Sequence, residues 1–241
     1  MNKSSIIITS TFEAEISETL ESMGIRNFVS VHALPDIERM YLKEKKKSQQ
    51  KDISKRAATR SPLLVSVGSE GLANRGWLIT EQSFLDITQS DDWSACFSPN
   101  SIDAIFAEHV WEHMTTTQAK VATKLCFRYL KYGGRLRLAV PDGYHESDSY
   151  IERVKPGGYG NGSDDHKVLY NYQSFSSLLE DVGFKVELLE YYDENRNLHT
   201  ATISENFGAI RRSVYNYPDN HTDKLNYDYS SLIIDAFKCP N

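Results

Sequence analysis

Four of the seven histidines lie in polar clusters where they could move protons: His109, His113, His145 and His166. Imidazole titrates close to neutral pH, so such a side chain can act as a general base for a hydroxyl nucleophile. His145 follows Asp142 by three residues, and that carboxylate could orient its ring. We therefore expect His145 to be the base, with Asp142 as its partner and His109 or His166 as alternatives. His113 is expected to be structural.

The same side chains could instead bind a metal ion. His109 and His113 are four residues apart and would share a helix face, and Asp142 and His145 could complete a set of nitrogen and oxygen ligands. The His-Glu-x-x-His spacing of zinc peptidases is missing, because Glu112 adjoins His113 rather than His109. We therefore predict no metal site, and a metal-dependent enzyme is kept as an alternative.

A second group of residues could hold a nucleoside. The turn at residues 67–71, Val-Gly-Ser-Glu-Gly, follows an apolar run, and its glycines would let the backbone approach a ligand closely. It is neither a P-loop nor a full Gly-x-Gly-x-x-Gly motif. Glu81 ends the next apolar run and could accept hydrogen bonds from both ribose hydroxyls, while Asp86 and Ile87 could read an adenine edge.

The expected order of strands and helices would bring these groups together. From Pro62 onward, apolar runs of strand length alternate with stretches of helical periodicity. Strands are expected at 63–67, 77–79, 102–107, 136–140, 186–189 and 232–236, and helices from Thr117 and Tyr172. Such alternation predicts an α/β fold, with a mostly parallel sheet and helices on both faces. Ligands bind beyond the carboxyl ends of such strands, where all the polar clusters lie.

Two segments precede this predicted domain of residues 62–241. Residues 1–42 have a β-α-β pattern and are expected to form a structural appendage that could mediate a homodimer. Residues 43–61 are expected to be a basic linker or exposed helix, because residues 43–60 contain eight basic and two acidic residues. An alternative is a patch that steers an anionic substrate or lipid surface. Within the domain, four glycines at 156–162 suggest a mobile lid or substrate loop.

Composition excludes several classes of protein. The 241 residues carry a net charge of −6, which argues against a dedicated nucleic-acid binder. No apolar run approaches the ~20 residues of a membrane span. The three cysteines lie far apart without a Cys-x-x-Cys pair, so we expect a reduced, cytoplasmic protein.

Residues 62–238 resemble the class I S-adenosylmethionine-dependent methyltransferases, in particular a type 11-like subgroup of predicted enzymes. The motifs that carry the resemblance are the turn at 67–71, Glu81, Ser-Ile-Asp-Ala-Ile at 101–105, Glu108 to His113, Leu-Lys-Tyr-Gly-Gly-Arg-Leu at 130–136, the segments 139–145 and 164–167, and the final pair of strands. Ser66 and Tyr132 stand where the family usually has an acid and a proline.

The resemblance implies a Rossmann-like, seven-stranded sheet whose last strand is antiparallel. It also implies an S-adenosylmethionine site, for which the residues expected are Gly68, Ser69, Gly71, Glu81, Asp86, Ile87, Glu108 and His109. Asp86 to Thr88 would lie at the end of a third strand. We expect O-methylation of a small polar or glycan-type acceptor, with or without a phosphate group. The alternative is a binding or regulatory module that keeps the fold but does not transfer a methyl group.

Overall fold

The computed structural model describes residues 6–8, 13–24, 28–30, 35–68, 76–160, 162–214 and 230–240. The chain divides into two compact units, residues 1–49 and residues 50–241. In the first unit, β1 (Ile6–Ile8) pairs in parallel with β2 (Phe28–Ser30), and α1 (Glu13–Ser22) connects them. The predicted β-α-β segment is therefore present.

Helix α2 (Pro35–Ala58) begins in the first unit and ends in the second. It contains most of the segment that we expected to be a basic linker or exposed helix. Beyond the boundary, Gln50 and Ile53 are buried, and Gln50 Nε2 donates to Phe84 O at 2.9 Å and Asp92 Oδ1 at 3.1 Å. The carboxyl-terminal turns of α2 are thus part of the larger unit.

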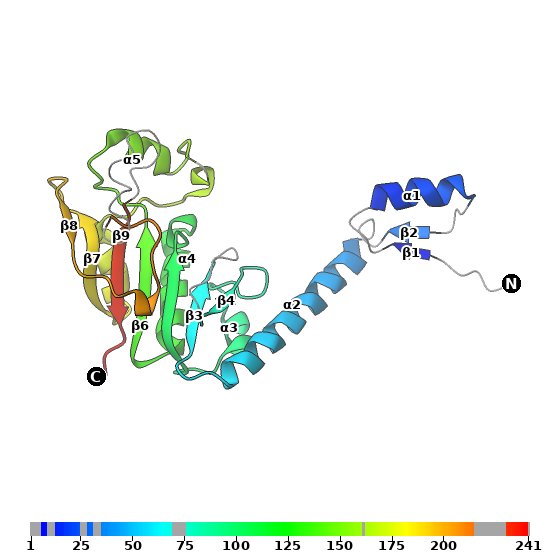
Figure 1. Ribbon diagram of the computed structural model, residues 1–241, viewed down its shortest axis with the longest axis horizontal. Coiled ribbons are helices and arrows are strands. Elements are labelled where there is room, and N and C mark those ends of the chain that lie inside the picture. The colour runs from blue at the N-terminus through cyan, green and yellow to red at the C-terminus, as the bar shows by residue number, and fades with distance from the viewer. Residues whose placement is uncertain are drawn as a thin grey trace. The chain divides into compact units, whose positions relative to one another are not determined.

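The larger unit is built on one seven-stranded sheet in the order β4-β3-β5-β6-β9-β7-β8 (Figure 1). The strands span Leu64–Val67 (β3), Leu78–Thr80 (β4), Ile102–Glu108 (β5), Leu130–Val140 (β6), Lys185–Tyr192 (β7), Leu198–Thr200 (β8) and Leu232–Phe237 (β9). β4, β3, β5 and β6 are parallel, and β9 is antiparallel to both β6 and β7. This is a Rossmann-like α/β fold, and the expected antiparallel final strand is confirmed.

The seventh strand is not where it was expected. Residues 86–88 form a turn, because Asp86 Oδ1 accepts hydrogen bonds from Thr88 N at 2.9 Å and Thr88 Oγ1 at 2.7 Å. This local bonding replaces the ladder of a third strand. The sheet reaches seven strands through β8, which forms a hairpin with β7 at the opposite edge.

The two faces of the sheet are covered differently. After α2, the described part of the chain contains the α-helices α3 (Ser90–Cys96), α4 (Thr116–Tyr129), α5 (Asp148–Val154) and α6 (Tyr172–Glu180). Side chains of α3, α4 and α6 pack with Ile105 and Leu138 in the main core. On the other face, Phe106 and Ile233 pack with Ile203 and Ile210 from the segment after β8. This segment contains the 3₁₀ helix η3 (Glu205–Phe207), whose Phe207 packs against the same cluster.

A buried ion pair fixes β9 beside β6. Arg137 and Asp235 face each other in the ladder, and Arg137 Nε and Nη2 donate to the two Asp235 oxygens at 2.7 and 2.8 Å. Such a paired, bidentate contact is the arrangement in which buried charges are tolerated.

In the described part of the chain, no helix has both the length and the apolarity needed to cross a membrane.

Candidate functional site

A glycine turn closes the carboxyl end of β3. Gly68 has a φ of +64°, and its N–H donates to Thr80 O at 3.1 Å, which holds the turn beside the end of β4. A Cβ at this position would lie 2.8 Å from Val110 Cγ2, so a side chain would not fit without movement. The remaining predicted cofactor residues of the turn, Ser69 and Gly71, lie outside the described residues.

Glu81 follows β4 directly and is half-buried. Its carbonyl accepts the N–H groups of Phe84 and Leu85 at 3.1 and 2.9 Å, which fixes the backbone in a tight turn. Its carboxylate accepts no hydrogen bond from the residues that the structure describes. A ligand with two hydroxyl donors could therefore bind there without displacing a protein contact.

The next predicted cofactor residues, Asp86 and Ile87, lie in the turn described above. One oxygen of Asp86 is engaged by Thr88, whereas the side chain of Ile87 is buried and its carbonyl accepts from Trp93 Nε1 at 3.0 Å. Any contact of these residues with an adenine ring stays a prediction.

Glu108 ends β5, and its carboxylate contacts the chain rather than open solvent. Glu108 Oε1 accepts the N–H groups of Arg211 and Arg212 at 3.1 and 3.0 Å. Glu190 on β7 acts similarly, accepting from Ser213 Oγ at 2.8 Å and Val214 N at 3.0 Å. Two acids at the ends of β5 and β7 therefore hold residues 211–214 against the sheet.

His109 lies on a turn that the backbone adopts only at a cost, because its φ is +56°. The turn directs its ring between two groups: Nδ1 lies 2.9 Å from Glu112 Oε1, and Nε2 lies 3.1 Å from Ser231 Oγ. The imidazole thus lies between a carboxylate and a hydroxyl, each close to one of its ring nitrogens. With the proton on Nδ1, the lone pair of Nε2 faces the hydroxyl.

Glu112 lies in the 3₁₀ helix η1 (Trp111–His113), and its side chain is fully buried. Neither carboxylate oxygen makes a hydrogen bond of good geometry with the described residues, although His109 is close. Burial opposes ionisation of this carboxyl, but the neighbouring His109 and His113 outweigh burial and lower its pKa.

His113 and His166 meet although they are far apart in the chain. Their rings are T-shaped at 4.8 Å between centroids, and one donor atom each from Glu112, His113 and His166 lies within 4.8 Å of the others. His113 Nδ1 lies 3.5 Å from Asp165 Oδ2. Burial and the nearby histidines lower the pKa of His166. Asp142 and His145, which we had grouped with His109 and His113, are not part of this cluster.

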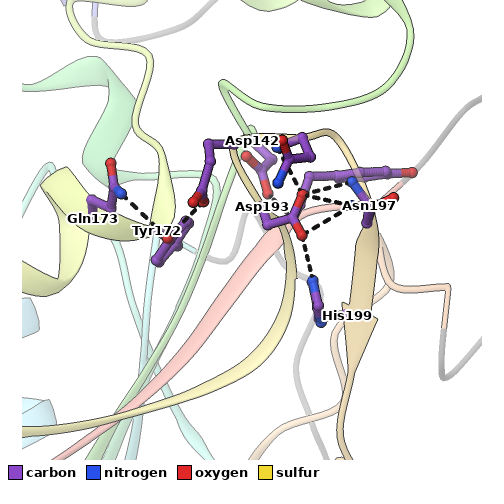
Figure 2. Close-up of polar contacts among 9 residues, drawn as sticks. Asp142, Tyr172, Gln173, Asp193, Asn197 and His199 are labelled. Carbon is purple, nitrogen blue, oxygen red and sulfur yellow. Dashed lines mark hydrogen bonds and ion pairs between the residues drawn. The ribbon is translucent and has the colours of Figure 1, made fainter.

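Asp142 connects the end of β6 to the end of β7. Its two oxygens accept from Tyr144 N at 2.9 Å and Tyr192 N at 2.8 Å, and Figure 2 shows it near the β7–β8 hairpin. Burial raises the pKa of Asp142 to about 6, with a smaller contribution from Glu190, although the two backbone N–H groups oppose the rise. The carboxylate thus has a structural role, and the catalytic role that we expected for it stays a prediction.

His145 is almost completely buried, with 2% of its surface exposed. Its Nδ1 accepts from Ser147 N at 3.0 Å, and its ring stacks on Tyr150 at 4.0 Å between centroids. In the neutral ring the proton therefore resides on Nε2. Acting as a base through Nε2 would require the ring to change tautomer and lose the contact with Ser147.

The β7–β8 hairpin contains a separate pair of a histidine and an acid, far from the cluster around Glu112 in the sequence. Asp193 accepts from His199 Nε2 at 2.9 Å and from Asn197 Nδ2 at 3.1 and 3.2 Å (Figure 2). The hydrogen bond from His199 and those from Asn197 lower the pKa of Asp193. These contacts close the turn.

No protein-family model and no curated protein matches the sequence. Solved structures of S-adenosylmethionine-dependent methyltransferases are similar to this chain in fold. One from Archaeoglobus fulgidus is 16% identical, with a TM-score of 0.44 over 80% of this chain and 94% of that one. One from Mesorhizobium loti is 9% identical, with a TM-score of 0.44 over 76% and 94%. Phosphoethanolamine N-methyltransferase 2 of Haemonchus contortus, solved with S-adenosyl-L-methionine, is 15% identical, with a TM-score of 0.40 over 80% and 53%.

Reasoning from the sequence missed three residues at the carboxyl edge of the sheet: Glu112 as a buried carboxylate, Glu190 and Ser231. Glu190 did carry a signal, because an acid interrupts the apolar run Leu-Leu-Glu-Tyr-Tyr of β7. Ser231 carried none, since a serine before a strand is common. Glu112 was recorded only for its spacing from the histidines.

Proposed function

We propose that this chain is an S-adenosylmethionine-dependent methyltransferase whose cofactor lies across the carboxyl ends of β3, β4 and β5. The observation that carries the proposal is the Glu81 carboxylate, which no described residue engages and which lies at the strand end next to the Gly68 turn. A carboxylate in this place is the usual partner of ribose hydroxyls in such sheets. The resemblance of the motifs in residues 62–238 supports S-adenosylmethionine as the nucleoside.

The acceptor side of this site lies over β5 and β6. Methyl transfer requires mainly alignment of the nucleophile with the methyl carbon, and a hydroxyl nucleophile also needs a base. His109 suits this role better than His145, because its Nδ1 lies 2.9 Å from Glu112 Oε1 and the Ser231 hydroxyl lies 3.1 Å from its Nε2. An acceptor hydroxyl would take that position. We therefore propose O-methylation of a small polar or glycan-type acceptor, with or without a phosphate, with His109 as the base.

Isothermal titration calorimetry with S-adenosylmethionine and S-adenosylhomocysteine tests the cofactor part of the proposal. Both should bind once per chain. If neither binds at millimolar concentration, the proposal is wrong. Mass spectrometry of acceptor mixtures incubated with methyl-labelled cofactor then tests transfer. Binding without any transfer across hydroxyl, phosphorylated and amine acceptors would favour a regulatory module with the same fold.

A further inference from the structure

We propose that Glu112, His113 and His166 form a binding site for a divalent transition-metal ion, for which Zn²⁺ is the best fit. One donor atom from each side chain lies within 4.8 Å of the other two. The proposal does not depend on methyl transfer, because metal binding is measured without any reaction.

The first argument is the state of Glu112. Its carboxylate is fully buried, yet both oxygens lack a hydrogen bond from the described residues. Buried carboxylates in proteins are normally hydrogen-bonded, paired with a cation or bound to a metal ion. His109 Nδ1 lies 2.9 Å from Oε1. The second oxygen therefore remains to be satisfied, and a cation between Glu112 and the two other histidines would do so.

The second argument is the orientation of the two histidines. His166 Nδ1 donates to Val154 O at 2.6 Å, so its other ring nitrogen is free to bind a metal. His113 Nδ1 faces the Asp165 carboxylate at 3.5 Å. Histidines that bind metals are typically held in this way, with one nitrogen on the metal and the other on a carbonyl or carboxylate.

The third argument is the way the chain holds His166 in place. Glu112 O accepts the N–H groups of Lys167 at 2.7 Å and Val168 at 3.3 Å. The backbone of the loop that carries His166 is thus bonded to the backbone of η1, which carries the other two residues. These two hydrogen bonds directly follow His166 in the chain and therefore hold it beside Glu112 and His113.

The donor set selects the metal. Two imidazoles and one carboxylate suit Zn²⁺ and similar transition ions, whereas Mg²⁺ and Ca²⁺ require more oxygen ligands. Donor atoms around tetrahedral Zn²⁺ are about 3.3 Å apart, so the three side chains must close by at most about 1.5 Å. His113 and His166 are only partly buried, which leaves them room to rotate. Three protein ligands leave a fourth position for water or another oxygen.

The test uses the full chain, freed of any histidine tag and stripped of metal with a chelator. Titration with Zn²⁺ alone should show one site per chain, and excess Mg²⁺ should not compete. Changing a group that merely orients a ligand costs about 10–100-fold in metal affinity, so Glu112→Gln and His166→Ala should each weaken Zn²⁺ binding at least that much. His199→Ala is the matched control, because it removes a histidine beside a carboxylate elsewhere, and it should leave the affinity unchanged.

A measurement on the unmutated chain keeps the proposal testable if a variant does not fold. X-ray absorption of the Zn²⁺-loaded protein should show imidazole scattering and nitrogen or oxygen ligands at about 2.0–2.1 Å. Zn²⁺ should also raise the melting temperature of the unmutated protein but not that of Glu112→Gln. The proposal is overturned if no stoichiometric site is found, if imidazole scattering is absent, or if Glu112→Gln and His166→Ala bind Zn²⁺ as the unmutated chain does. In those cases His109 alone balances the charge of Glu112.

Discussion

The two halves of the sheet's carboxyl edge differ in the burial of their carboxylates and in the groups that face them. On the nucleoside side, formed by Gly68, Glu81 and Asp86, the Glu81 carboxylate is half-buried and has no donor among the described residues. On the histidine side, formed by His109, Glu112, His113, Asp142, His145 and His166, the acids are buried and face imidazoles or backbone N–H groups. Leaving a buried carboxylate without partners is costly. The first side is therefore suited to be completed by a ligand, whereas the chain assembles most of the second side in advance and leaves an oxygen of Glu112 for the proposed metal ion.

The largest effect that this comparison predicts concerns His109. If the histidine side performs the chemistry, His109→Ala should lower kcat by ~10²–10⁴-fold, because it removes the base. The Kd for S-adenosylhomocysteine should change little, since the nucleoside side is untouched. His145→Ala is the comparison variant: it should reduce the melting temperature more than turnover, because His145 is buried against Tyr150. An active His109→Ala enzyme with an inactive His145→Ala or His166→Ala enzyme would move the base to that residue.

The pH dependence of unfolding should show the energetic cost of burying the ionised Asp142 carboxylate on the histidine side. Its pKa is raised to about 6 in the folded protein, against an ordinary value near 3.8, so the folded state binds the proton more tightly than the unfolded state. The resulting stabilisation is complete below about pH 4 and is lost as the pH rises through about 6, which amounts to about 3 kcal/mol. Asp142→Asn should remove this pH dependence. Urea unfolding of both proteins at pH 4 and pH 8 measures it, and equal slopes with pH would contradict the assignment.

Glu81→Ala should weaken cofactor binding without affecting the fold. Loss of a hydrogen bond to a charged group costs roughly 1.5–3 kcal/mol, or about 10–100-fold in Kd. Asp91→Ala, which removes an exposed acid from the first turn of the nearby α3, is the control and should bind normally. Calorimetry with S-adenosylhomocysteine measures both. Normal binding by Glu81→Ala would mean that the ribose is held elsewhere.

Gly68→Ala should have the smallest effect of the four changes. It separates the cost of backbone strain at positive φ from the cost of crowding by a neighbouring side chain. An L-residue at positive φ costs about 1–2 kcal/mol, and at Gly68 the new methyl group would also meet Val110. Gly133→Ala is matched to it, because Gly133 has a similar φ of +78° and no heavy atom within 4 Å of the new Cβ. Gly68→Ala should therefore lower the free energy of unfolding more than Gly133→Ala does. The excess should shrink in a Val110→Ala background.

The sheet was largely predictable because its strands are buried on both faces and therefore read as apolar runs. Ile102–Glu108 and Leu232–Phe237 are examples. The prediction failed at Asp86, where a side chain bonds its own backbone turn and no strand forms. It also omitted the edge strand β8, whose three residues, Leu-His-Thr, are too few and too polar to give a pattern.

The candidate site was predictable only where its contacts are local. His109 and Glu112 belong to one polar cluster of the sequence, residues 108–113, and their side chains lie 2.9 Å apart, a contact that the sequence analysis did not predict. The meeting of Glu112 with His166 depends on how the loop after α5 docks onto η1, and no spacing in the sequence encodes that docking. The same applies to Asp142, whose partner Tyr192 N lies fifty residues away and on another strand.

The central place of β9 has a consequence for synthesis of the protein on the ribosome. β6 and β7 are translated before β9, yet in the finished sheet they do not pair with each other, because β9 lies between them. Until residues 232–237 emerge, both strands have open edges, and Arg137 on β6 lacks its ion-pair partner Asp235. Open edges of this kind pair readily with other chains. Nascent chains stalled before Leu232 should therefore be the form of this protein that most needs a chaperone.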